Sequence, residues 1–193
     1  MIDSVKKTYK SIVIGSSAGG FHTIPQILCE LPQNYPMSVV LILHMKEGGG
    51  EFYVEYLDSK CKLKTKKAMQ LEEAERGFIY LAPPDFHLYM DREMVFSLSV
   101  DDKVNYSRPS IDVLFESAAK ALGNELIGIV LTGMGCDGTM GMINIKERGG
   151  LTIAQTPHTA QASEMPENVI KTGVVDHILS PNEIAEFLLN IIS

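Results

Sequence analysis

The stretch Ile12–Phe21, IVIGSSAGGF, joins a short apolar run to a turn rich in glycine and serine. The segment FHTIPQILCEL continues from it, with apolar residues at helical spacing until Pro32. The next apolar run, MSVVLIL, is continuous and β-branched, which is typical of a central parallel strand covered on both faces. Strand, helix and strand in this order predict a β-α-β unit with a right-handed crossover.

The middle of the chain departs from this alternation. The segments GFIYLAP, HLYMDR and MVFSLSV are short, and a polar turn at Asp91–Glu93 separates the last two, which predicts a strand followed by a hairpin. We therefore predict an α/β fold of three layers, with a doubly wound, mostly parallel Rossmann-like sheet and a β-hairpin insertion in the middle. The later strands are predicted in ELIGIVLTG, LTIAQ and VVDHIL, and the later helices in RPSIDVLFESAAKALG, near Met140–Arg148, near Glu164–Lys171 and over Asn182–Ile192.

Length and composition indicate one soluble domain over residues 1–193, with 45% apolar and 21% charged residues. A net charge of −7 argues against nonspecific binding to nucleic acid or to an anionic membrane. No apolar run approaches the roughly 18 residues of a membrane span, and no signal peptide is visible, so we expect a cytoplasmic protein. The lysine-rich segment Lys60–Lys67 is interpreted as a solvated edge strand and turn rather than a binding patch.

The cysteines and most histidines show no metal-site pattern, and we predict neither a metal ion nor a cofactor. Because Cys29, Cys61 and Cys136 lack Cys-x-x-Cys spacing, they are expected to be reduced thiols, not a disulfide framework or a zinc site. Four histidines are expected to be structural: His22, His87, His158 and His177.

The glycine turn fits a nucleophile elbow. Residues Gly15–Gly19, GSSAG, match G-x-S-x-G with Ser17 at the centre, where a sharp turn exposes the hydroxyl. A dinucleotide fingerprint fits less well, because position 17 is serine and the next strand ends in His44 instead of an acidic residue. A P-loop is missing its Gly-Lys-Ser/Thr, so a looser nucleotide site is the phosphate-binding alternative that remains.

Two further strand ends complete a candidate triad. Ligand chemistry gathers at the carboxyl ends of parallel strands, so His44 is expected beside Ser17, where an imidazole can accept the serine proton. Asp137 follows another buried strand, in LTGMGCDGTMG, and a carboxylate there would fix the imidazole tautomer. The alternative for Asp137 is a helix N-cap. The amides of Gly133–Gly135 are candidate oxyanion donors.

These motifs together resemble the catalytic domain of the CheB family, the chemotaxis protein-glutamate methylesterases. The resemblance runs from about Ile12 to Leu179 and rests on IGSSAGG, LILHM, FIYLAPPDFHL, RPSIDVLFESAA, IGIVLTGMGCDGTMGM, GGLTIAQ and EMPENVIKTGVVDHIL. It implies a serine triad in the order Ser17, His44 and Asp137. It also puts Met134 where the family uses backbone near the oxyanion, and we predict oxyanion donors at Met134 and Gly135.

The family resemblance implies a function and partners. The expected activity is hydrolysis of glutamyl methyl esters on the cytoplasmic helices of methyl-accepting chemotaxis receptors, with deamidation of receptor glutamines in some members. Receptors and other chemotaxis signalling proteins are the implied partners. About ten residues precede the first strand, so the receiver domain of many relatives is missing, and we expect a stand-alone esterase or a fragment. A catalytically degenerate receptor-binding module and a nucleotide-binding α/β domain are the alternatives.

The sequence departs from the family pattern at three places. Ala18 stands where threonine is usual after the nucleophile, and Cys136 where asparagine usually precedes the aspartate. Tyr56–Leu57 replaces an Arg-Leu pair in the helix after the histidine. This last difference bears on docking to the substrate protein more than on the chemistry.

Overall fold

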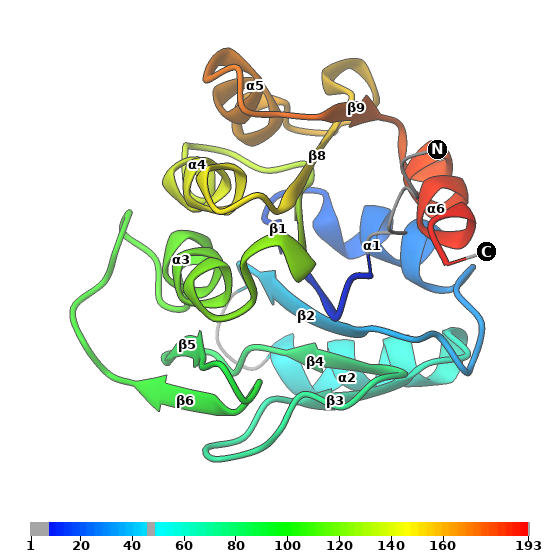
Figure 1. Ribbon diagram of the computed structural model, residues 1–193, viewed down its shortest axis with the longest axis vertical. Coiled ribbons are helices and arrows are strands. Elements are labelled where there is room, and N and C mark those ends of the chain that lie inside the picture. Colours follow the sequence, from blue (N-terminus) through cyan, green and yellow to red (C-terminus); the bar gives the residue numbers. More distant parts are fainter. Residues whose placement is uncertain (1–7, 46–48, 193) are drawn as a thin grey trace, which may run out of the picture.

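The structure is a computed structural model that describes residues 8–45 and 49–192. Its main sheet is parallel, with the order β3-β4-β2-β1-β7-β8-β9, and β5 and β6 form a separate antiparallel hairpin (Figure 1). The strands are β1 (Ser11–Ser16), β2 (Ser38–Leu43), β3 (Lys64–Lys67), β4 (Phe78–Leu81), β5 (His87–Met90), β6 (Phe96–Ser99), β7 (Leu126–Val130), β8 (Leu151–Gln155) and β9 (His177–Leu179). The helices are α1 (Gly20–Leu28), α2 (Gly49–Lys60), α3 (Ile111–Leu122), α4 (Thr139–Glu147), α5 (Glu164–Lys171) and α6 (Pro181–Asn190), with short 3-10 turns at Gly123–Glu125 and Pro157–Thr159.

Helices cover both faces of this sheet, as the continuous apolar strands predict. Every residue of β1 and β2 is buried. Because side chains alternate between faces along a strand, Ile12 joins a core with α1, α2 and α6, whereas Val13 joins a core with α3, α4, α5 and the hairpin. Figure 1 shows α3 and α4 on one side of the sheet and α1 and α6 on the other. The predicted three-layer fold with its hairpin insertion is confirmed.

The lysine-rich segment ends in an edge strand, as expected. β3 pairs only with β4, and three of its four residues are lysines, Lys64, Lys66 and Lys67. Charged side chains on an exposed edge discourage pairing with another chain. Among the described residues, no helix is both long enough and apolar enough to cross a membrane.

Two features of the fold differ from the sequence-based expectations. Helix α2 was implied only by the family resemblance and not by the residue pattern, because it buries only Gly50, Tyr53 and Leu57 and lacks a clear apolar stripe. The expectation of three reduced thiols is wrong for Cys29 and Cys61, which form a disulfide. Their helices α1 and α2 end side by side in one layer, so residues far apart in sequence meet. Cys136 is free and exposed.

Candidate functional site

Three neighbouring strands bring the predicted residues to one edge of the sheet. β1 lies between β2 and β7, and Ser16 pairs with Leu43 at the last position of the β1–β2 register. The next residues in each strand direction are Ser17 and His44, and the His44 amide donates to the Ser16 carbonyl at 3.0 Å. On the other side, the Ser17 amide donates to the Thr132 carbonyl at 3.0 Å. The nucleophile and base candidates therefore leave adjacent strands at the same level.

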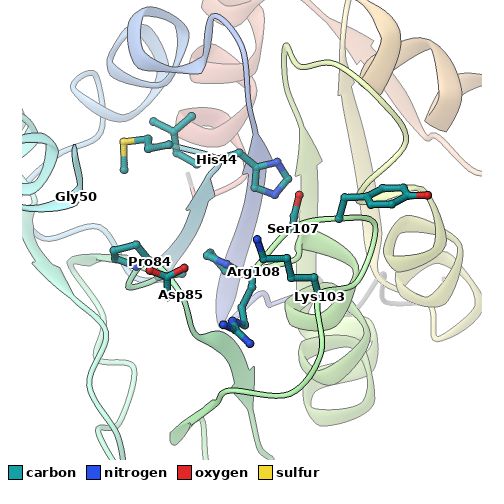
Figure 2. A pocket seen from close by; sticks show the side chains of 12 residues that line it. His44, Gly50, Pro84, Asp85, Lys103, Ser107 and Arg108 are labelled. Carbon is teal, nitrogen blue, oxygen red and sulfur yellow. The ribbon is translucent and has the colours of Figure 1, made fainter. Parts of the chain in front are cut away.

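A cavity of about 260 Å³ opens beside His44. Figure 2 shows Asp85 on one side of it and Lys103 and Arg108 on the other. Arg108 also holds its own loop, because its Nη1 donates to two backbone carbonyl oxygens at 2.8 and 2.9 Å. The cavity thus combines the imidazole with two cationic side chains and one carboxylate, which suits a polar or acidic ligand group.

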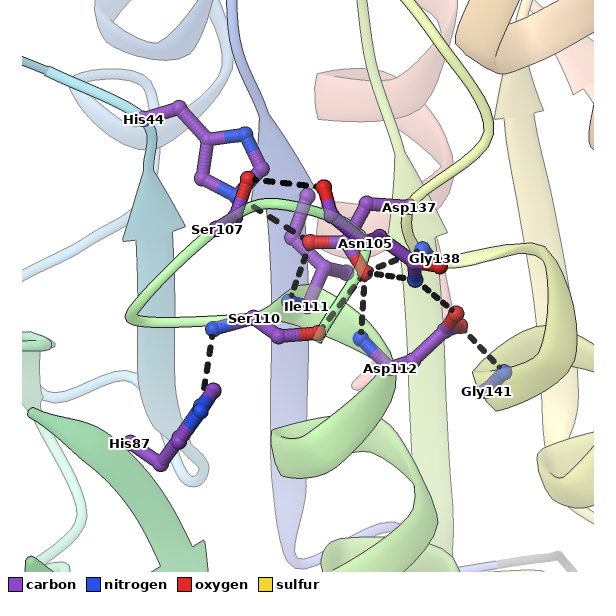
Figure 3. Close-up of polar contacts among 10 residues, drawn as sticks. All are labelled: His44, His87, Asn105, Ser107, Ser110, Ile111, Asp112, Asp137, Gly138 and Gly141. Carbon is purple, nitrogen blue, oxygen red and sulfur yellow. Dashed lines mark hydrogen bonds and ion pairs between the residues drawn. The ribbon is translucent and has the colours of Figure 1, made fainter. Parts of the chain in front are cut away.

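The imidazole of His44 faces the carboxylate of Asp137 (Figure 3). Nε2 of His44 lies 3.1 Å from Oδ2 of Asp137, and both side chains are largely buried. The contact is close but does not meet hydrogen-bond geometry, so the ring is not aligned for a linear bond. Since Nε2 faces the carboxylate, Nδ1 is the nitrogen left to exchange a proton with a substrate or with Ser17.

The start of α3 surrounds the Asp137 carboxylate with donors. Oδ2 accepts from the Ile111 amide at 2.8 Å, and Oδ1 accepts from the Asp112 amide at 3.1 Å and the Ser110 hydroxyl at 2.8 Å. Asp137 therefore satisfies free amides at the N-terminus of α3, where a negative charge is favoured. The N-cap residues are Gly138 for the following helix, α4, and Ser110 for α3, so the alternative that Asp137 is a helix N-cap is wrong.

The donors around Asp137 decide its charge state. Burial raises the pKa of this carboxyl group, but contacts with His44 and Asn105 and the α3 amides outweigh burial and leave the pKa below its usual value. The group is therefore an anion at neutral pH. An anion at this position can orient the imidazole and stabilise its protonated form.

Asn105 joins Asp137 to a second buried carboxylate. Its Nδ2 donates to Oδ1 of Asp137 at 2.9 Å and to Oδ2 of Asp112 at 2.7 Å. Oδ1 of Asp112 also accepts from the Gly141 amide at 2.7 Å. Burial raises the pKa of Asp112, and the nearby Asp137 charge adds to that effect. The predicted site did not include Asn105, Ser110 and Asp112. The polar helix start in RPSID is the sequence signal for Ser110 and Asp112, whereas Asn105 precedes it on a loop and carries no such signal.

His87 has the structural role that was expected. Its side chain is fully buried, and Nδ1 accepts from the Ser110 amide at 3.2 Å. The other nitrogen, Nε2, then donates to the Asp102 carbonyl at 3.0 Å, which fixes a neutral tautomer. The ring therefore ties β5 to the loop that carries Asn105.

The serine is in place but not bonded to the histidine. Ser17 is half-buried, and its hydroxyl makes no hydrogen bond with His44, although both residues lie in the described part of the chain. Catalytic hydrogen bonds are often long or poorly aligned before substrate binds. A complete triad requires the Ser17 hydroxyl and the His44 imidazole to come within hydrogen-bond distance of each other.

The predicted oxyanion loop is only partly available. The Gly133 amide donates to the Ala162 carbonyl at 2.9 Å, and the Gly135 amide donates to Oε2 of Glu164 at 2.8 Å. The role of Gly135 as an oxyanion donor stays a prediction, and it requires the bond to Glu164 to open because the amide is engaged in this arrangement. The Met134 amide has no hydrogen-bond partner among residues 8–45 and 49–192, and its role stays a prediction.

Comparisons with known proteins agree with the fold and identify the family. The sequence profile of the CheB methylesterase family matches residues 12–188. A protein of Leptospira interrogans is 40% identical over 183 residues, which cover 95% of either chain. The protein-glutamate methylesterase/protein-glutamine glutaminase of Thermotoga maritima is 38% identical over 186 residues, 95% of this chain and 54% of that protein. The protein of the same name in Nitrosomonas europaea is 38% identical, over 94% of this chain and 51% of that protein.

A solved structure shows the same architecture. The crystal structure of the Thermotoga maritima CheB methylesterase catalytic domain matches with a TM-score of 0.92 at 38% identity. The match covers 95% of this chain and 99% of that chain. The chain therefore spans about half of the Thermotoga and Nitrosomonas proteins but nearly all of the solved domain.

Proposed function

Because the chain belongs to the CheB methylesterase family, we propose that it is a serine hydrolase that removes methyl groups from glutamyl methyl esters of chemotaxis receptors. The observation that carries the proposal is the 3.1 Å contact between His44 and Asp137, one strand away from Ser17. An imidazole held by an anion beside a serine is the arrangement that activates a hydroxyl for acyl transfer.

In the first step, the Ser17 hydroxyl attacks the ester carbonyl while Nδ1 of His44 takes its proton. Asp137 stabilises the imidazolium that forms, and the Met134 amide is the proposed donor to the oxyanion. The C–O bond to the methoxy group then breaks, and His44 returns the proton so that methanol leaves. The product is an acyl ester between the glutamyl side chain and Ser17.

In the second step, a water molecule attacks this ester and loses its proton to Nδ1 of His44. The bond to Ser17 breaks, the serine recovers the proton, and a free glutamate side chain leaves. A glutamine side chain would follow the same route with ammonia as the leaving group. We therefore propose deamidation of receptor glutamines as a second activity of the same residues.

The proposed substrates are the cytoplasmic helices of methyl-accepting receptors, so the proposed place of action is the cytoplasm. The cavity beside His44 supports this choice, because Lys103 and Arg108 on its wall favour a substrate with acidic side chains near the ester. The family match favours the esterase over the nucleotide-binding alternative. The remaining alternative, a receptor-binding module without turnover, is distinguished from the esterase by the methanol-release and labelling experiment below.

The test compares wild type with Ser17→Ala on methylated receptor helices, with methanol release as the measurement. The variant should lose at least about 10³-fold in kcat, because the triad acts as a unit. A fluorophosphonate probe should label the wild type at Ser17 and leave the variant unlabelled. Equal methanol release by the two proteins, or a wild type that neither turns over nor takes the probe, would exclude the serine mechanism.

A further inference from the structure

The contacts of α5 assign a positioning role to two of its side chains. We propose that Glu164 and Asn168 hold the loop Gly133–Gly135 so that the Met134 amide points to the oxyanion. This inference rests on the proposed function, because it concerns the donor that the hydrolysis would use. Neither side chain is placed against the reacting atoms, so both are positioning residues and not catalytic ones.

The loop lies directly against the nucleophile. A Cβ atom added at Gly133 would stand 3.0 Å from Cβ of Ser17 and 2.0 Å from the sulfur of Met165. Only glycine therefore lets the loop pass between the serine and α5. At this separation, a small shift of the loop changes the direction of the Met134 amide relative to the Ser17 hydroxyl.

Four hydrogen bonds from residues 162–168 fix the loop on both sides of Met134. Gly133 donates to the Ala162 carbonyl and accepts from the Met165 amide at 3.0 Å. Gly135 donates to Oε2 of Glu164 at 2.8 Å and accepts from Nδ2 of Asn168, also at 2.8 Å. The carbonyl of the Gly133–Met134 peptide and both backbone polar groups of Gly135 are thus anchored, and the Met134 amide is the loop donor left without a partner among residues 8–45 and 49–192.

The conformation of Gly135 explains why side chains are needed here. Its φ is +85°, in the left-handed region, and nothing lies within 4 Å of the place where a Cβ atom would stand. Packing therefore does not hold this turn, and hydrogen bonds to α5 do. Asn168 donates to the Gly135 carbonyl, and Glu164 accepts from the Gly135 amide. These two bonds hold the turn on both sides.

Glu164 is the first residue of α5, and its carboxylate is not used to cap that helix. Ser163 is the N-cap of α5, and its hydroxyl donates to Oε1 of Glu167 at 2.7 Å. The Glu164 carboxylate instead reaches away from its own helix to the glycine loop. The same contact allows an opposite effect, in which the carboxylate competes with the oxyanion for loop amides, and the experiment separates the two.

The experiment compares Glu164→Ala and Glu164→Gln with the control Glu183→Ala, on the Ser17-dependent release of methanol. Glu183 makes a similar bond at the start of α6, accepting from the Ser180 amide at 2.7 Å, far from the site in sequence and fold. Glu164→Ala should lower kcat about tenfold with KM within about twofold, because a misdirected Met134 amide weakens a contact that forms only with the oxyanion, and a tenfold loss corresponds to about 1.4 kcal/mol. Glu164→Gln keeps an acceptor oxygen, so its kcat should stay within about threefold of the wild-type value.

The control should lose thermal stability and keep kcat, because its hydrogen bond is only structural. A Glu164→Ala protein with unchanged kcat, or with a kcat loss matched by Glu183→Ala at equal loss of stability, would overturn the proposal. A faster Glu164→Ala protein would also overturn it and would make the carboxylate a competitor of the oxyanion.

Hydrogen exchange gives a readout that does not depend on activity. The Gly135 amide should exchange slowly in the wild type and at least about tenfold faster in Glu164→Ala, with no change in Glu183→Ala. Fast exchange of the Gly135 amide in the wild type would refute the positioning role of Glu164. A wild type that lacks esterase activity but keeps a protected Gly135 amide would refute the proposed function and leave the positioning of the loop by Glu164 supported.

Discussion

Asn105 offers the sharpest test of how the site is held together. Its amide stands between the carboxylates of Asp112 and Asp137, and its backbone has φ of +51°, which asparagine and glycine tolerate better than alanine does. Asn105→Gly therefore removes the side chain without backbone strain. Asn105→Asp keeps the shape and exchanges the amide donor for a third carboxylate.

The expected loss follows from the two hydrogen bonds. Bonds to charged groups contribute roughly 1.5–3 kcal/mol each, and the exposed loop around Asn105 lets water replace part of this. Asn105→Gly should therefore lower the free energy of unfolding by about 2–3 kcal/mol. That corresponds to a fall in Tm of about 4–12 °C for a domain of this size. Asn105→Asp should lose more at neutral pH, because three carboxylates would then meet.

The loss should depend on pH in a defined direction. Burial raises the pKa of Asp112, and the bond from Asn105 opposes that rise, so removing Asn105 raises the pKa of Asp112 further. An acid with a raised folded pKa contributes stability while it is protonated and loses that contribution as pH rises through the folded pKa. The destabilisation of Asn105→Gly should therefore be greater at about pH 8 than at about pH 5.

Urea unfolding at the two pH values measures these differences, with Asn144→Ala as a control. Asn144 is a half-buried asparagine of α4 whose Nδ2 donates to the Met140 carbonyl at 3.0 Å. Its replacement should cost less than about 0.5 kcal/mol at both pH values. Two results would show that the Asn105 bridge between Asp112 and Asp137 is not stabilising. One is an Asn105→Gly protein whose free energy of unfolding at pH 8 lies within about 0.5 kcal/mol of wild type. The other is a loss of stability that is greater at pH 5 than at pH 8.

Three further predictions concern other parts of the chain. Gly133→Ala should cost about 1–3 kcal/mol and most of the esterase activity, because the new methyl group would overlap a methionine sulfur, whereas Gly49→Ala, with no contact under 3.6 Å, should change neither Tm nor kcat. Replacing Cys29 and Cys61 by serine should lower the free energy of unfolding by about 3–4 kcal/mol, the chain-entropy value for their separation of 32 residues, and urea curves with and without reductant check this. The pKa of Asp137 lies below its ordinary 3.8, so its charge contributes stability at pH 7 that is lost as pH falls through the folded pKa. Asp137→Asn should therefore be less stable than wild type at pH 7, the difference should shrink as pH falls below 3.8, and a difference that stays constant or widens there would contradict this.

The parts of the fold that were predicted are those in which local pattern and tertiary burial agree. The runs IVIG and VVLIL are apolar because both faces of the sheet are covered, so periodicity alone identified them as central strands. Helix α2 buries three scattered residues and begins at glycines, so its sequence carries little helical signal. The disulfide was missed for a related reason, since it depends on how the ends of α1 and α2 meet.

The candidate site was predictable where it follows strand ends. Because parallel strands end at one edge, Ser17, His44 and Asp137 could be placed together without knowing their side-chain contacts. Asn105 and Glu164 could not, since one lies on an exposed loop and the other in a helix next in space but 29 residues from Gly135. The contact between Glu164 and the Gly135 amide was not predictable for the same reason, because tertiary packing sets it.

The carboxylate that faces the imidazole is also the anchor for the first turn of α3. A change at Asp137 therefore affects both the stability of the fold and the proposed turnover. A variant selected for heat resistance through stronger hydrogen bonds between α3 and Asp137 would weaken the interaction of the same carboxylate with the His44 imidazole. Homologous enzymes adapted to different temperatures should consequently differ in how they share this one anion between the two tasks.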